Sequence, residues 1–339
     1  MTAREPKPVW AEVPDALKEK LARLAGEKIA DGEIAWGGYA PSATFTLTTA
    51  SGRRLFCKGA HPGQTEMGHK ALLSERRKYE RFPELARFGP AYLGGADHEN
   101  WHMALLDHVP RGRSVPPWSD ATTGQALQLL ADFHAAAPER AAHELRPFGE
   151  ALAKMHRQGG WESLRDDAAA QARFLALFDD VAAARHWFDR NIARIAACDA
   201  DAAATGGPQS WLHLDIRSDN LIFAADGRLV LVDWPELAHG AVLFDVAAFL
   251  PSLEGEGGPR CADALRRYEA LSGHAFDAAD VARAVANVSG YFAARAGEDT
   301  IAGLPRLRWI QKVQLFPALR WLAERLALDA PPMPRAVAP

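Results

Sequence analysis

The sequence contains little cysteine and no long apolar run. Its three cysteines, Cys57, Cys198 and Cys261, are odd in number and far apart, so they match neither a disulfide framework nor a CxxC metal motif. The first residues lack the apolar core of a signal peptide, and no uninterrupted apolar stretch reaches the length of a membrane span. We therefore expect a soluble, cytoplasmic protein that does not bind a membrane.

An excess of positive charge is also absent. The net charge is -4, so the sequence gives no sign of the broad basic surface that nucleic-acid binding requires. With 339 residues, of which 48% are hydrophobic and 24% charged, the chain has the composition of a globular protein and enough length for two lobes. We expect a monomer or a weak homodimer without a nucleic-acid partner.

The first third of the chain predicts a β-rich region. Helical periodicity covers residues 14–28, and Gly32 is expected to end that helix. Two stretches rich in β-branched and aromatic residues flank Ala50-Ser51-Gly52, which is typical of a hairpin. The expected elements are strands at 44–49 and 53–58, a helix at 64–82, strands at 91–93 and 101–106, and a linker at 107–117.

The remainder predicts mainly helices. Helical patterns cover residues 122–137, 167–198, 260–271, 278–296 and 305–328. Strands at 221–224 and 229–232 flank Asp226-Gly227, a strong hairpin signal. The fold class is therefore α+β, with a small β-rich N-terminal lobe at 1–107, a larger α-rich C-terminal lobe at 108–339, and a frayed proline-rich tail from residue 331.

One motif combines the side chains that phosphoryl transfer needs. It runs from His213 through Asp215 to Asn220, and Asp233 follows the hairpin. Asp215 is placed to orient a substrate hydroxyl as a base, and Asn220 and Asp233 offer hard oxygen ligands to Mg²⁺. Taken singly, Asp215 could be a capping aspartate and Asn220 a turn residue. Their combination at this spacing favours the catalytic interpretation.

Two further residues of the motif have separate expectations. Arg217 lies two residues after Asp215, from where its cation could reach the transferring phosphate; the alternative is a solvent-exposed arginine. His213 is expected to pack and to form hydrogen bonds that shape the loop, because a single histidine is weak evidence for a metal site.

The pattern His213-x-Asp215-x-x-x-x-Asn220 with Asp233 resembles the aminoglycoside phosphotransferase-like small-molecule kinases. The resemblance implies the bilobal protein-kinase-like fold, ATP as phosphate donor, Mg²⁺ as cofactor, Asp215 as catalytic base, and Asn220 and Asp233 as magnesium ligands. It also implies that Lys58 contacts the α- and β-phosphates.

The same resemblance assigns supporting roles. Glu75 matches the helix glutamate that pairs with the strand lysine, with Glu80 as its rival. Asp245 matches a buried aspartate that braces the catalytic loop through backbone hydrogen bonds. The linker at 105–109 would offer backbone groups to adenine, so Leu106, Asp107 and Val109 are expected at the nucleotide.

Strand alternation adds Phe56 to the nucleotide candidates. Phe56 and Lys58 are two residues apart on one strand, so their side chains share a face. If Lys58 faces the nucleotide, Phe56 does so too and could stack on adenine. The alternative is a core phenylalanine.

Two stretches depart from the family pattern. Residues 37–42 lack GxGxxG, so we infer a phosphate cover from position, backbone amides and the Ser42 hydroxyl; a turn without a ligand is the alternative. Residues 216–219 read Ile-Arg-Ser-Asp where aminoglycoside kinases commonly have Leu-His-Pro-Gly. The second departure affects the identity of the acceptor more than the assignment of the reaction.

The acceptor is expected to be small. Eleven residues separate Asp233 from Asp245, too few for the long segment by which protein kinases bind a polypeptide. Several carboxylates could meet a cationic acceptor, but arginines occupy the same region, which favours a solvated face in which the acids have partners. The acidic candidates are Glu236, Glu254, Glu256, Glu298 and Asp299.

Together these features predict an ATP-dependent phosphotransferase that moves the γ-phosphate to a hydroxyl of a small molecule. The acceptor would be an antibiotic such as an aminoglycoside, or a sugar or amino-alcohol metabolite. The first alternative is a catalytically silent nucleotide-binding regulatory module. The second is nucleotidyl transfer to a protein, which uses similar ligands with the nucleotide reversed.

Overall fold

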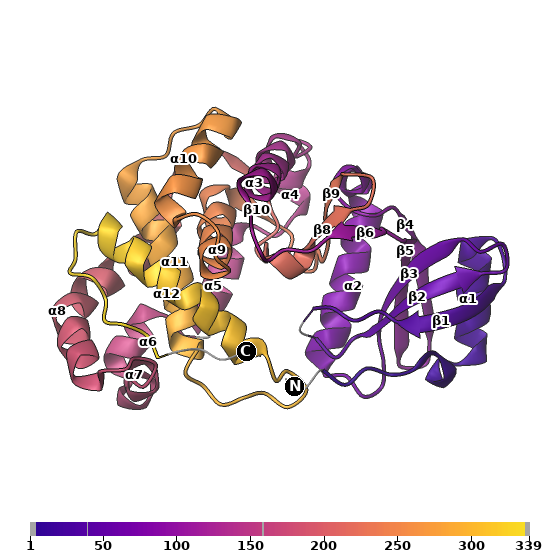
Figure 1. The fold of residues 1–339 in the computed structure, drawn as a ribbon, viewed down its shortest axis with the longest axis horizontal. Coiled ribbons are helices and arrows are strands. Elements are labelled where there is room, and N and C mark those ends of the chain that lie inside the picture. Colours follow the sequence, from indigo (N-terminus) through magenta and orange to yellow (C-terminus); the bar gives the residue numbers. More distant parts are fainter. Residues whose placement is uncertain (1–4, 39, 158, 336–339) are drawn as a thin grey trace. The chain divides into compact units, whose positions relative to one another are not determined.

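The computed structural model describes residues 5–38, 40–157 and 159–335 (Figure 1). Contacts divide the chain into two compact units. Unit 1 comprises Met1–Ser114, Asp219–Glu236 and Ala302–Pro305, and unit 2 comprises Val115–Ser218, Leu237–Ile301 and Arg306–Pro339. The predicted lobes, 1–107 and 108–339, differ from these units mainly in the segment 219–236.

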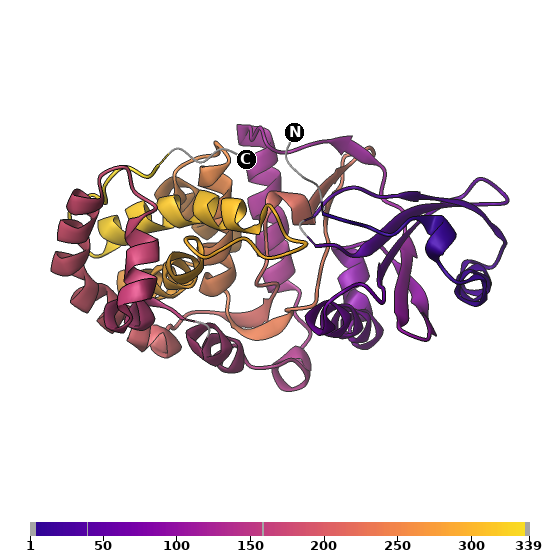
Figure 2. The ribbon, with the colours of Figure 1, turned by 90° about the horizontal axis from the view of Figure 1, so that it is seen from below.

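Unit 1 is built on a five-stranded antiparallel sheet (Figure 2). Its spatial order is β1-β2-β3-β5-β4. The strands are β1 (Ile29–Ile34), β2 (Ala43–Thr49), β3 (Arg54–Ala60), β4 (Tyr92–His98) and β5 (Trp101–Asp107). The hairpin predicted around Ala50-Ser51-Gly52 is confirmed, since β2 pairs with β3.

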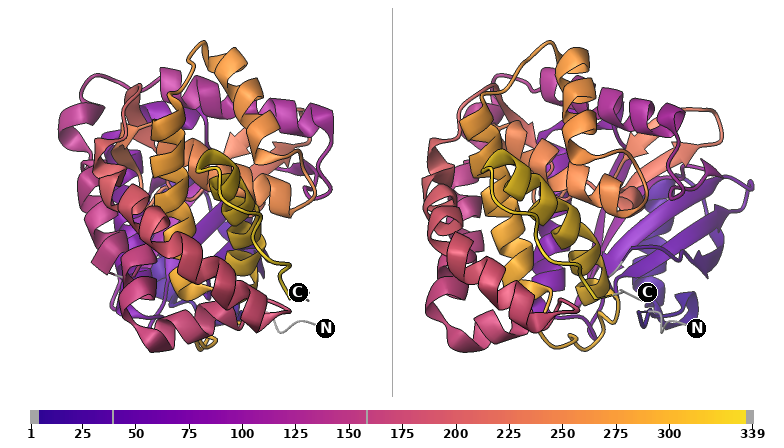
Figure 3. Two further views of the ribbon diagram at one scale, coloured as in Figure 1. Left: turned by 90° about the vertical axis from the view of Figure 1, so that its left-hand side faces the viewer. Right: turned by 60° about the vertical axis from the view of Figure 1, so that its left-hand side comes forward.

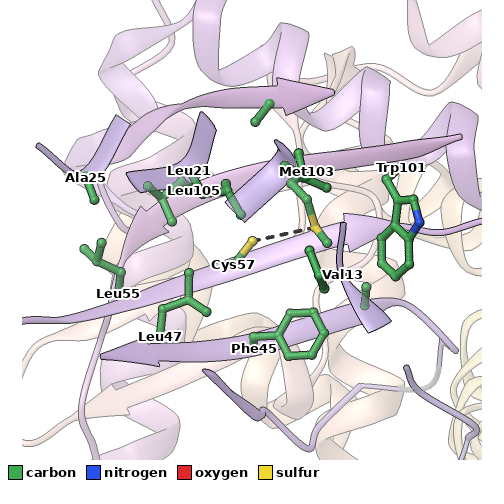
Figure 4. Packing of buried hydrophobic residues seen from close by; sticks show 13 residues of the cluster. Val13, Leu21, Ala25, Phe45, Leu47, Leu55, Cys57, Trp101, Met103 and Leu105 are labelled. Atoms are coloured by element: carbon green, nitrogen blue, oxygen red, sulfur yellow. Dashed lines mark hydrogen bonds between the residues drawn. The ribbon is translucent and has the colours of Figure 1, made fainter. Parts of the chain in front are cut away.

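One face of this sheet packs against α1 (Asp15–Ala25) and holds a hydrophobic core (Figure 4). Alternate side chains of the central strands point into it: Phe45 and Leu47 of β2, Leu55 and Cys57 of β3, Met103 and Leu105 of β5. The Cys57 Sγ lies 3.7 Å from the Met103 Sδ, and burial raises the pKa of the thiol to about 12. Cys57 therefore acts as a small apolar side chain, and all three cysteines are free.

The intervening side chains point to the opposite face, where α2 (Glu66–Arg81) packs. Unit 1 also contains a three-stranded sheet of β6 (Arg111–Arg113), β8 (Leu221–Ala224) and β9 (Leu229–Leu231). The predicted hairpin is confirmed: β8 pairs antiparallel with β9, and Gly227 in the turn has a φ of 89°. A glycine suits that turn because φ is positive there.

The first helix is shorter than predicted. It ends at Ala25, where Gly26 caps it in the left-handed conformation with a φ of 76°. Gly32 lies instead within β1, where an added Cβ would come 2.6 Å from the Trp10 ring. Gly32 therefore does not end the helix. Because it has no side chain, β1 can lie close to the Trp10 indole.

Unit 2 is mainly helical (Figure 3). A two-stranded sheet of β7 (Gln209–Leu212) and β10 (Ala238–Ala241) interrupts the helices. The longer helices are α3 (Asp120–Ala135), α5 (Phe148–Arg157), α7 (Ala168–Leu175), α8 (Val181–Ala200), α9 (Leu243–Gly255), α10 (Cys261–Ser272), α11 (Ala278–Arg295) and α12 (Leu307–Arg325). The shorter ones are α4 (Ala141–Glu144) and α6 (Trp161–Asp166). The predicted α+β class, β-rich and then α-rich, is confirmed.

Two helical predictions need correction. The single helix expected at 167–198 is two helices, because Asp180 accepts a hydrogen bond from the Ala183 amide and starts α8 anew. Helix α9 was not expected. It is buried on nearly all sides, so its sequence lacks the polar face that reveals a helix.

The prediction of a frayed tail is wrong for residues 331–335. The Arg335 amide donates to the Leu177 carbonyl at 2.9 Å, and the Arg335 Nε donates to the Phe178 carbonyl at 2.9 Å. Residues 336–339 lie outside the described part of the chain. Within that part, no helix has both the length and the apolarity that a membrane crossing requires.

The core of unit 1 gives a stability prediction. Phe45 has no exposed surface and meets the Trp10 ring edge-on at 5.2 Å. We expect Phe45→Ala to lower the free energy of unfolding by about 3–5 kcal/mol, measured by denaturant titration, because it leaves a cavity. Met67→Ala is the control: Met67 is 74% exposed, so a change within about 0.5 kcal/mol is expected. Equal losses in the two variants would contradict this core.

Candidate active site

A cavity of about 440 Å³ lies in unit 1 on the sheet face opposite the α1 core. Its walls come from the β1–β2 loop, strands β2 and β3, helix α2, the segment 106–111 and the β8–β9 hairpin. A volume of this order is typical of pockets that hold a small organic ligand. The cavity is therefore the candidate nucleotide site.

Lys58 lines this cavity and bridges two carboxylates. Its Nζ lies 2.7 Å from Glu75 Oε2 and 2.7 Å from Asp233 Oδ1. Burial alone would lower the pKa of Lys58, but the charges of Asp233 and Glu75 raise it above its ordinary value. Lys58 is therefore a fixed cation on the cavity wall.

The structure separates the two glutamates that compete for Lys58. Glu75 is buried on α2 and its Oε1 accepts a hydrogen bond from the Trp234 amide at 3.3 Å. Burial raises the pKa of Glu75, and the Lys58 charge opposes that rise. Glu80 instead accepts a hydrogen bond from the Tyr92 hydroxyl at 3.0 Å. Glu75 is thus the ion-pair partner.

Asn220 and Asp233 line the same cavity from the two ends of the β8–β9 hairpin. The Val232 amide donates to the Asn220 carbonyl at 3.0 Å, which closes the base of the hairpin. Asp233 has a φ of 78°, a conformation that aspartate tolerates better than most residues. One carboxylate and one carboxamide are donors that suit Mg²⁺, which takes its other ligands from phosphate and water.

The predicted adenine contacts also line the cavity. Phe56 pairs across the sheet with Leu106, and both belong to the cavity wall, as do Asp107 and Val109. Phe56 is absent from the α1 core, so it lies on the face that strand alternation predicts. The Asp107 carboxylate lies 2.7 Å from Arg53.

Ser42 is placed differently from the expectation. It is 9% exposed, its Oγ accepts a hydrogen bond from Gln64 at 3.2 Å, and it is not among the residues that line this cavity. The loop lines the cavity with Trp36, Gly37 and Gly38 instead. Tyr39, within the expected phosphate cover, lies outside the described residues. A nucleotide contact by Ser42 stays a prediction.

Some lining residues were missed by the sequence reasoning. Thr44 pairs with Lys58 and Thr46 with Phe56 across the β2–β3 ladder, so all four side chains share one face. The same strand alternation, applied to the neighbouring strand β2, predicts that both threonines share this face. Trp36, half-exposed in an irregular loop, carried no such signal.

The catalytic-loop motif begins in unit 2, between β7 and the 3-10 turn Ser218–Asn220. The Arg217 Nη1 lies 2.7 Å from Asp215 Oδ1, and the Arg217 side chain is only 16% exposed. Arg217 is therefore paired with the predicted base, which excludes the alternative of a solvent-exposed arginine. The pair places a cation beside the carboxylate at which proton transfer is expected.

Asp245 braces this loop from α9, as the resemblance implied. It is fully buried, and its two oxygens accept hydrogen bonds from the His213 and Leu214 amides, both at 2.6 Å. His134 Nε2 lies 3.2 Å from Asp245, and its Nδ1 lies 2.6 Å from the Tyr268 hydroxyl. His213 has the expected structural role, since its Nδ1 accepts a hydrogen bond from the Asp215 amide.

Leu214 is held in a conformation that L residues avoid. Its φ is 64°, in the left-handed region, immediately before Asp215. Such a backbone costs about 1–2 kcal/mol in a residue with a side chain and persists only where the surroundings enforce it. The hydrogen bond to Asp245 supplies that enforcement.

Comparisons with known proteins agree with this description. A model of the phosphotransferase enzyme family matches residues 32–284. A search of curated protein sequences gives no match. An aminoglycoside phosphotransferase from Alicyclobacillus acidocaldarius superposes with a TM-score of 0.58 at 16% identity, over 93% of this chain and 96% of its own.

Two other solved structures are similar. A spectinomycin phosphotransferase in complex with ADP and spectinomycin gives a TM-score of 0.55 at 13% identity, over 89% of this chain and 93% of its own. Choline kinase LicA from Streptococcus pneumoniae gives 0.55 at 18% identity, over 91% and 98%. At these identities the likeness shows a shared fold, and it confirms the kinase-like fold that the motif implied.

The strain at Leu214 is open to measurement. Leu214→Gly and Leu214→Ala both remove the side chain beyond Cβ, but only glycine adopts a φ of 64° without strain. We expect the glycine variant to unfold with a free energy about 1 kcal/mol higher than the alanine variant in denaturant titrations. The reverse order would show that the loop does not hold this conformation in solution.

Proposed function

Because the chain belongs to the phosphotransferase enzyme family, we propose that it is a kinase that transfers the γ-phosphate of ATP to a hydroxyl of a small molecule. One observation carries the proposal. Lys58 joins Glu75 and Asp233, at 2.7 Å each, on the wall of a cavity that Asn220 also lines. Phosphoryl transfer depends on such a set of positioned charges more than on covalent chemistry by the protein.

The cavity supports ATP as the donor. Phe56 and Leu106 give an apolar wall for a purine ring, and the linker backbone at 106–109 offers hydrogen-bonding groups. Lys58 would bind the α- and β-phosphate oxygens, and Glu75 would keep its side chain extended. A nucleotide site in this fold has a precedent in the spectinomycin phosphotransferase, whose structure contains ADP.

Asn220 and Asp233 would hold the magnesium ion. When bound, Mg²⁺ would offset the charge that develops on the phosphates during transfer. Asp233 pairs with Lys58, so the side chain that would bind the phosphates and the one that would bind the metal hold each other in place.

Asp215 would act on the acceptor. Its carboxylate would take the hydroxyl proton as the acceptor oxygen bonds to the γ-phosphorus and ADP leaves with the electron pair of the broken bond. Arg217, paired with Asp215 at 2.7 Å, would offset charge on the transferring phosphate. The loop reaches Asn220 five residues after Asp215, so base and metal ligand share one short segment.

Two acceptor classes remain candidates: an antibiotic such as an aminoglycoside, and a sugar or amino-alcohol metabolite. Most acidic candidates for binding a cationic acceptor already have partners within unit 2. Glu254 pairs with Arg320 at 2.6 Å, and Glu298 pairs with Arg308 at 2.7 Å. These pairs favour carboxylates that are balanced within unit 2 over a binding site for a polycation, so the proposal requires no charge on the acceptor.

The proposal predicts ADP release that depends on an acceptor. Purified protein with ATP and Mg²⁺ is tested against aminoglycosides, spectinomycin, choline, other amino alcohols and sugars, and mass spectrometry identifies the product. Asp215→Asn should lower kcat by about 10²–10⁴-fold, the usual contribution of a general base. Asp226→Asn, in the exposed hairpin turn, is the matched control and should leave kcat unchanged.

The alternatives give different outcomes in the same assay. Tight ATP binding with no turnover against any compound would support the silent regulatory module. A nucleotide adduct on the product in place of a phosphate would support nucleotidyl transfer. Unchanged activity in Asp215→Asn would contradict the assignment of the base.

A second prediction tests the metal ligand. Asp233→Ala should abolish ADP release while the Kd for an ATP analogue, measured by calorimetry with Mg²⁺, rises far less, by about 10²-fold, because magnesium matters most as charge develops. Asp226→Ala is the control for a carboxylate lost from the same hairpin. A variant at position 233 with wild-type turnover would rule out this site.

A further inference from the structure

Glu256 directly follows α9 and joins two segments that are distant in sequence. Its Oε1 accepts a hydrogen bond from the Ser218 hydroxyl at 2.6 Å, and its Oε2 accepts one from the Trp118 indole at 3.0 Å. The Glu256 amide donates to the Ser252 carbonyl, which anchors the residue to the helix end. All of these residues belong to unit 2.

The partners of Glu256 are themselves restrained. Ser218 is 7% exposed, and the Trp118 ring meets Phe249 of α9 edge-on at 6.3 Å. A carboxylate that accepts two hydrogen bonds at these distances forms strong, directional contacts. Glu256 therefore fixes the position of Ser218 relative to α9.

Ser218 begins the 3-10 turn Ser218–Asn220, which ends at a proposed magnesium ligand. It stands where aminoglycoside kinases commonly have proline, a residue that restricts the backbone through its own ring. Serine has no such restriction. In this chain the hydrogen bond from the Ser218 hydroxyl to Glu256 restrains the loop at this position instead.

We propose that Glu256 is a positioning residue for the metal-binding end of the catalytic loop, acting through Ser218 on Asn220; this rests on the proposed kinase function. Asp245 restrains the start of the same loop from the first turn of α9. Helix α9 thus holds the loop at both ends, with Asp245 near its beginning and Glu256 directly after its end.

A neighbouring glutamate distinguishes this role from general support. Glu254 lies two residues earlier and is also paired, but its partners are Arg320, at 2.6 Å, Arg260, at 3.4 Å, and the Cys261 amide, at 2.8 Å. None of these residues belongs to the catalytic loop. Glu254 is therefore a matched control for loss of a paired carboxylate at the same helix end.

The test measures how strongly magnesium improves nucleotide binding. Calorimetry gives the Kd for a non-hydrolysable ATP analogue in EDTA and with Mg²⁺, and the ratio of the two values is the magnesium-dependent gain in affinity. The Asn220→Ala variant shows how far this gain falls when a proposed metal ligand is lost. We expect Glu256→Ala to reduce the magnesium-dependent gain by roughly tenfold, the effect of one charge-assisted hydrogen bond, with the EDTA value unchanged. Ser218→Ala should match it, and the double variant should lose no more than either single one.

Glu256→Gln should keep the gain within about twofold, because the amide has the same shape and can still bond both partners. Glu254→Gln should lower the melting temperature without changing the gain. Additive losses in the double variant, or an equal loss in Glu254→Gln, would overturn the positioning role alone. Failure of the wild type to bind the analogue would overturn the proposed function and this inference with it.

Discussion

The ion pairs of Lys58 are the interaction on which unit 1 depends. A buried ammonium is costly unless carboxylates lie close by, and Lys58 meets two of them at 2.7 Å. Those partners come from α2 and from the end of the β8–β9 hairpin, 175 residues away from Lys58 in the second case. The requirement to balance one charge thus joins strand, helix and hairpin around a single cavity. Removing either carboxylate would leave the Lys58 ammonium in the cavity wall with one carboxylate fewer to balance its charge, which is destabilising.

Local patterns predicted the parts of this arrangement that depend on one strand or one turn. Alternation placed Phe56 beside Lys58, and Asp226-Gly227 marked the hairpin that brings Asn220 and Asp233 to one cavity. The family resemblance predicted a bracing role for Asp245, and its carboxylate accepts hydrogen bonds from two backbone amides of the loop. The alternation and the hairpin were accessible because each is encoded within a few consecutive residues, whereas Asp245, 32 residues from His213, required the family resemblance.

Other features could not be predicted because tertiary contacts decide them. Helix α9 has no polar face, so its periodicity is hidden by burial. The hydrogen bond from Gln64 to the Ser42 hydroxyl joins two segments 22 residues apart, and no local pattern predicts it. Residues 331–335 looked frayed, yet backbone groups at 177 and 178 bind Arg335. In each case the deciding partner is remote in sequence.

The hydrogen bonds that Asp245 accepts from the catalytic loop also determine how that loop opens. Leucine disfavours the φ of 64° that Leu214 adopts, so the loop keeps its shape only while α9 stays in position. Helix α9 packs in turn against α10, α11 and α12. The His213 and Leu214 amides, which donate to Asp245, should therefore exchange with solvent no faster than this helical packing opens. The five irregular residues 213–217 thereby gain a lifetime that their own sequence would not provide.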